Sequence, residues 1–134
     1  MADALLEVQG AVHAMLRADT ALATLVAARI YVTVPESPAF PYVSFGPADA
    51  ASEDAECIDG LEITFQIDVW SRSGGGTDAK QIGGVVRKAL HGADVVLADN
   101  AAVLCEHRTS RAIRDPDGLT AHVALTFTAF VEVA

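Results

Sequence analysis

The stretch LEITFQIDVWSRSGGGTDAKQIGGVVRKAL, residues 61–90, decides the fold. Its first nine residues alternate strictly, with apolar residues at odd positions and polar residues at even positions. A period of two predicts a strand with one face in the core and the other open to solvent. The open face is expected to carry Glu62, Thr64, Gln66 and Asp68.

A turn and an amphipathic helix follow the strand. The turn is predicted to be flexible because it contains three consecutive glycines, Gly74, Gly75 and Gly76. Thr77 or Asp78 is expected to cap a helix whose apolar residues recur at spacings of three and four. Gly92 is placed to end that helix.

The remaining segments predict a mixed set of helices and strands. They indicate a helix from Asp3 to Arg17, a short helix opened by Asp19 and Thr20, an edge segment at Arg29–Val32, a strand at Pro41–Phe45, a solvated loop from Asp49 to Asp59, a strand from Val103 to Ile113, a tight turn at Asp115–Gly118 and a last strand from His122 to Val133. This order lacks the alternation of strand and helix that a parallel sheet requires. We expect an α+β fold: a single, mostly antiparallel sheet of about four strands with two main helices on one face, forming one domain over residues 1–134.

Composition restricts the function. The chain has 134 residues, 18 acidic against 9 basic, for a formal net charge of −9. This balance disfavours duplex binding, which needs clustered Lys and Arg. Two cysteines without CxxC spacing predict neither a disulfide framework nor a zinc site. No apolar run approaches the roughly 18 residues of a membrane span, so we expect a soluble protein made in the cytoplasm, with no membrane partner.

Catalytic and metal-binding chemistry is weakly represented. The glycine turn lacks Walker spacing, and the histidines lack HxxxH or HxH spacing, so we expect no metal and no cofactor. His107 and His122 are interpreted as cross-strand neighbours in the final hairpin. Acidic neighbours of Cys57 oppose thiolate formation. We therefore expect no catalytic residues.

Two charged groups of residues are candidates for contact surfaces. The acidic candidates for a loop or channel lining are Asp49, Glu53, Asp54, Glu56, Asp59, Glu62 and Asp68. The candidates for subunit interface or docking are Arg108, Arg111, Arg114, Asp115, Asp117, Gly74, Gly75 and Gly76. The arginines recur every third residue and suit acidic groups of a neighbouring subunit, although a solvated basic edge is an equal alternative.

The order of these motifs resembles a known family over nearly the whole chain, from about Leu5 to Val131. The matching segments are Arg29-Ile30-Tyr31, Phe40-Pro41-Tyr42-Val43, Val69-Trp70-Ser71, a helix with Lys80, Ile82, Val86 and Leu90, and Arg114-Asp115-Pro116-Asp117-Gly118-Leu119-Thr120. The chain resembles the phage tail-completion or tail-terminator proteins of the head-tail joining group, found in long-tailed phages, prophages and gene transfer agents.

The resemblance implies a structural, non-enzymatic virion protein that is assembled in the host cytoplasm. It implies a homo-hexameric ring at the head-tail junction, which caps the tail tube, joins the head stopper or connector on its other side, and lets DNA pass without specific binding. Two alternatives stay open. One is a neighbouring neck or stopper ring, and the other is a small cytoplasmic enzyme or ligand-binding domain that uses Cys57 or His107.

Overall fold

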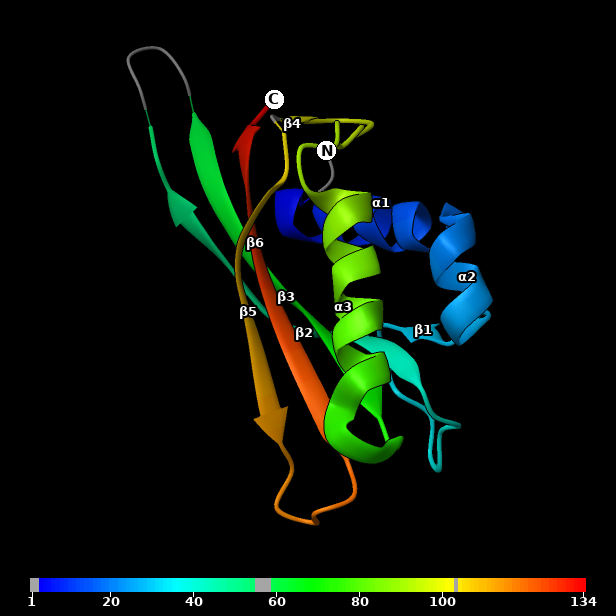
Figure 1. Cartoon of the computed structure of the whole chain (residues 1–134). Coiled ribbons are helices and arrows are strands. Elements are labelled where there is room, and N and C mark those ends of the chain that lie inside the picture. Colours follow the sequence, from blue (N-terminus) through cyan, green and yellow to red (C-terminus); the bar gives the residue numbers. More distant parts are fainter. Residues whose placement is uncertain (1–2, 55–58, 103) are drawn as a thin grey trace.

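Helices cover one face of a twisted sheet in the computed structural model, which describes residues 3–54, 59–102 and 104–134 (Figure 1). The elements are α1 (Ala4–Ala18), α2 (Thr20–Val26), β1 (Ile30–Tyr31), β2 (Tyr42–Ser52), β3 (Gly60–Ser71), the 3₁₀ turn η1 (Gly74–Gly76), α3 (Thr77–Leu90), β4 (Ala101–Ala102), β5 (Glu106–Arg114) and β6 (Ala121–Glu132). Within the described residues the sheet has six strands in the order β1-β2-β3-β6-β4, and β5 also pairs with β6. Among the strand pairs of the described residues, only β1–β2 is parallel.

The α+β class and the mostly antiparallel sheet are confirmed, whereas the number of strands is higher than expected. The described residues contain two long α-helices, α1 and α3, and the short α2, as predicted, and the short β1 and β4 strands extend the sheet beyond four strands. None of the helices in those residues is long and apolar enough to cross a bilayer.

The central strand β3 confirms the period of two. It pairs with β2 on one side and β6 on the other, and its odd positions enter the core. Ile67 lies opposite Leu125, and Phe65 stacks on Phe127 with ring centroids 5.4 Å apart. These side chains pack against the helices, so the alternation determines which face of the sheet is covered.

The two N-terminal helices begin at aspartates, as predicted. The Asp3 carboxylate accepts a hydrogen bond from the Leu6 N–H at 3.0 Å, and that of Asp19 accepts one from the Leu22 N–H at 2.8 Å. Each carboxylate satisfies one of the backbone donors that a helix start leaves without a partner.

The predicted cap of α3 is wrong. Gly76, in a left-handed conformation with φ +70°, is the N-cap residue, and no side chain caps this end. Thr77 is already helical, and the Asp78 carboxylate accepts from the Ser71 hydroxyl at 2.6 Å. The predicted end is confirmed, because Gly92 follows the C-cap residue with φ +73°.

The predicted loop from Asp49 is also wrong in its first part. Residues 49–52 belong to β2 and pair with β3, with Asp49 opposite Thr64 and Ala51 opposite Glu62. A β-bulge between Phe45 and Ala48 keeps the two strands paired after the register shift. The β2–β3 hairpin consequently extends well past the helices (Figure 1).

The last two strands form the expected hairpin, but their register differs from the prediction. Strand β5 begins at Glu106, and Val103 lies outside the described residues. The turn is confirmed, since the Gly118 N–H donates to the Asp115 carbonyl at 3.0 Å and Gly118 has φ +71°. His107 and His122 are not cross-strand neighbours: His107 lies opposite Phe127, and His122 lies opposite Ile113.

Candidate assembly surfaces

The outer part of the β2–β3 hairpin is acidic and is called the acidic arm below. It exposes four carboxylates, which belong to Asp49, Glu53, Asp54 and Asp59. Glu62 is half-buried on β3, and the predicted Glu56 lies outside the described residues. The pairing of β2 with β3 therefore concentrates negative charge at one end of the sheet.

Backbone contacts hold the base of the acidic arm. The Glu53 N–H donates to the Gly60 carbonyl at 2.8 Å, and the Gly60 N–H donates to the Asp54 carboxylate at 3.1 Å. A Cβ at Gly60 would lie 2.5 Å from the Phe130 ring and 2.6 Å from the Glu53 carbonyl oxygen. Glycine is therefore required at this position by a close approach of backbone to backbone.

Strand β5 is an exposed basic edge at the opposite side of the sheet. In the described residues it pairs only with β6, so its other edge has no strand neighbour. A bulge between His107 and Thr109 changes the alternation of side chains, which puts Arg108 and Arg111 on the face away from the helices. Arg108 donates to the Thr128 hydroxyl at 2.8 Å, which also lies on that face.

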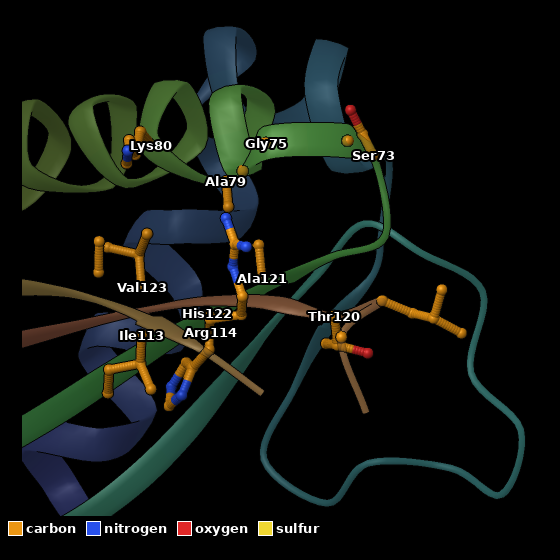
Figure 2. A pocket seen from close by; sticks show the side chains of 15 residues that line it. Ser73, Gly75, Ala79, Lys80, Ile113, Arg114, Thr120, Ala121, His122 and Val123 are labelled. Atoms are coloured by element: carbon orange, nitrogen blue, oxygen red, sulfur yellow. The ribbon is translucent and has the colours of Figure 1, made fainter. Parts of the chain in front are cut away.

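Arg114 points to the other face and lines a groove of about 310 Å³ between α3 and the β5–β6 hairpin (Figure 2). Lys80 of α3 is a second cation in this lining. The sequence prediction missed the groove's apolar residues, Ile113 and Leu119, which are 38% and 68% exposed. The sequence did contain one indication of an exposed apolar site, because Leu119 directly follows the predicted Asp-Pro-Asp-Gly turn.

The predicted glycines and turn carboxylates have structural roles around the same groove. The three glycines line it as η1, and a Cβ at Gly76 would lie 3.2 Å from the Ala121 Cβ. The Asp117 carboxylate accepts from the Thr120 and Leu119 N–H groups and from the Thr120 hydroxyl, and these hydrogen bonds lower the pKa of Asp117. The Asp115 carboxylate accepts from the Asp117 N–H at 3.1 Å.

Asp68 is not part of an open acidic face, which corrects the prediction from alternation. It is 5% exposed, and its carboxylate accepts from His122 Nε2 at 2.6 Å and from Gln66 Nε2 at 2.8 Å. Trp70 stacks on the His122 ring at 3.9 Å and donates through Nε1 to the Ser44 hydroxyl at 2.9 Å. Aromatic rings thus cover this part of the face, which leaves little of Asp68 exposed.

His107 is held in a hydrogen-bonded cluster at the start of β5. Arg87 Nε donates to His107 Nδ1 at 3.3 Å, and the His107 N–H donates to His91 Nδ1 at 3.0 Å. Burial lowers the pKa of His107, and the nearby Arg87 and His91 lower it further. No group of three or more His, Cys, Asp or Glu residues within the described ranges is arranged to hold a metal ion.

The cysteines offer no activated nucleophile in the described structure. Cys105 is fully buried, and burial followed by the charge of Glu106 raises the pKa of its thiol to about 12. A thiol with such a pKa stays protonated at neutral pH. Cys57, the other cysteine considered for an enzyme, lies outside the described residues.

The described residues thus carry an acidic arm at one end of the sheet and a basic groove at the other. Residues 10–132 match the family described as Tail completion protein gp17, and the chain belongs to this family. The solved structure titled "Virion of native gene transfer agent (GTA) particle" contains a chain that is 34% identical, with a TM-score of 0.89 over 98% of this chain and 99% of that chain. No curated protein matches the sequence.

The resemblance stated from the sequence motifs is thereby confirmed. The chain is a structural protein of a phage-type tail, and its location is the virion.

Proposed function

We propose that the protein is a tail terminator, which forms a hexameric ring on the tail tube and joins it to the connector or stopper on the head side. The match to the tail-completion family over residues 10–132 carries this proposal. Support comes from the similarity of the whole fold to a chain in a gene transfer agent virion. The role is structural and requires no catalysis.

The charge of the chain suits a ring around passing DNA. Six copies at −9 each carry a formal charge of −54. Carboxylates at the lumen repel the phosphate backbone, so that DNA slides through without being held. The half-buried Glu62 is a candidate for this lining, whereas the Asp68 side chain is buried.

Particles made without the protein provide the test. A terminator stops tail polymerisation, so its deletion should give abnormally long tails or polytubes in electron micrographs. Normal tails beside heads that leak DNA would instead indicate a neck or stopper ring. Normal, active particles would contradict both roles.

A map of the intact particle tests the oligomeric state separately. We expect six copies of this chain in one ring at the head-proximal end of the tail tube. Density for the chain in any other stoichiometry, or at another position, would contradict the hexameric terminator.

A further inference from the structure

The acidic arm and the basic groove lie at opposite ends of the same strand. Strand β3 runs from Gly60, at the base of the arm, to Ser71, beside the groove. Eleven steps of a β-strand span about 36 Å. Because β3 is paired on both sides, one subunit cannot bring its own arm into its own groove.

The cations of the groove have no carboxylate partner of their own. Arg114 and Lys80 form no ion pair within residues 3–54, 59–102 and 104–134. The nearby carboxylates are occupied, because that of Asp78 accepts from Ser71 and that of Asp117 accepts from three donors. The groove therefore presents positive charge beside the exposed apolar side chains of Ile113 and Leu119.

The two sheet edges that border these surfaces lack neighbours as well. Strand β1 pairs with β2 only at Val43 and Ser44, so the described part of β2 beyond them pairs with β3 alone. Strand β5 pairs with β6 alone in the same described residues. An unpaired strand edge readily accepts another strand, and in this sheet the β2 edge is acidic whereas the β5 edge is basic.

We infer that the acidic arm of one subunit docks against β5 and the groove of a second copy of this chain. The inference rests on the proposed ring and identifies its subunit contact. Asp49 and Glu53 lie near Arg111 and Arg114 of the neighbour in this arrangement, and the arm covers Ile113 and Leu119. Such a contact joins two different surfaces, and head-to-tail contacts of this kind close into rings when the rotation per subunit allows it.

Two charge-reversal variants test the contact. The β5 variant, Arg111→Glu/Arg114→Glu, has an acidic arm and an acidic β5, so it should not self-associate. The arm variant, Asp49→Arg/Glu53→Arg, has both surfaces basic and should also remain monomeric. In an equal mixture every contact regains opposite charges, so the two variants should assemble in strict alternation.

Native mass spectrometry and particle yield are the two readouts. We expect loss of oligomer for each variant alone and, in the mixture, rings with equal numbers of the two subunits, three of each in a hexamer. Cells that make only one variant should yield few particles, and cells that make both should regain wild-type yield. If the wild-type protein forms rings only on the tail, and not in solution, particle yield is the readout that tests the inferred contact.

Two control variants make the same changes of charge at other exposed positions. Arg17→Glu/Lys88→Glu matches the β5 variant, and Glu36→Arg/Asp94→Arg matches the arm variant. These should leave assembly unchanged, and melting temperatures verify that all variants fold. Lys80→Glu/Arg114→Glu, in which both substituted residues line the groove, replaces the β5 variant if the latter does not fold. The inferred contact would be overturned if either charge-reversal variant assembled alone, or if the mixture of the two variants failed to assemble. Normal tails in particles made without the protein would instead overturn only the proposed function.

Discussion

Removal of the Asp68 carboxylate tests whether this residue is structural or lines a channel. Asp68→Ala leaves His122 Nε2 and Gln66 Nε2 without the acceptor that they contact at 2.6 and 2.8 Å. A buried donor left without a partner costs about 1–3 kcal/mol. The His122 side chain is 15% exposed, so water can replace part of the loss. We therefore expect the free energy of unfolding to fall by about 2 kcal/mol.

Urea denaturation measures this change, and Glu62→Ala provides the matched control. Glu62 lies on the same face of β3 but is only half-buried, so its loss should change the unfolding free energy by less than about 0.5 kcal/mol. In a His122→Ala background the effect of Asp68→Ala should shrink, because one donor is already absent. Equal effects of Asp68→Ala and Glu62→Ala would refute the structural role.

Three other predictions concern the arm, the buried thiol and the loop before β4. Gly60→Ala should lower the unfolding free energy by about 1–3 kcal/mol in urea denaturation, and Phe130→Leu should not restore it, because the Glu53 carbonyl still blocks the new Cβ. In a Cys57→Ser background Cys105 should resist alkylation at pH 8 until the protein unfolds, since burial raises its pKa to about 12, and rapid alkylation of folded protein would contradict this. The hydrogen bond from the Asp99 N–H lowers the pKa of Glu7. The ionised Glu7 should therefore stabilise the fold fully above pH 4.5, and this stabilisation should disappear as the pH falls through the folded-state pKa. In urea denaturation at a series of pH values, Glu7→Gln should make the unfolding free energy depend less on pH on the acid side.

Features that depend on neighbours in sequence were predictable. The alternation in β3, the aspartates that begin α1 and α2, and the turn closed by Gly118 are all local, and each is present in the structure. Spacing of apolar residues and the chemistry of caps and turns determine these elements within a few residues.

Features that depend on pairing between distant segments were not predictable. Asp68 occupies a polar position of an alternating strand, yet its burial depends on His122, 54 residues away in the chain. The small and acidic residues 49–52 are typical of a loop, but they extend β2 because β3 supplies hydrogen-bond partners. The groove forms only where α3 packs beside the β5–β6 hairpin, so the sequence alone could not predict that Lys80 and Leu119 line the same groove.

The uneven distribution of charge reconciles the proposed acidic channel with the proposed assembly of an acidic chain. Subunits of formal charge −9 would repel one another if that charge were spread evenly. Most of the few cations instead lie on α3 and β5, namely Lys80, Arg87, Lys88, Arg108, Arg111 and Arg114. In the inferred contact a neighbour's carboxylates are attracted to Arg111 and Arg114, while the remaining surface stays negative. Salt weakens such exposed charge contacts, so we expect the apolar side chains of Ile113 and Leu119 to supply the part of the inferred contact that persists at high ionic strength.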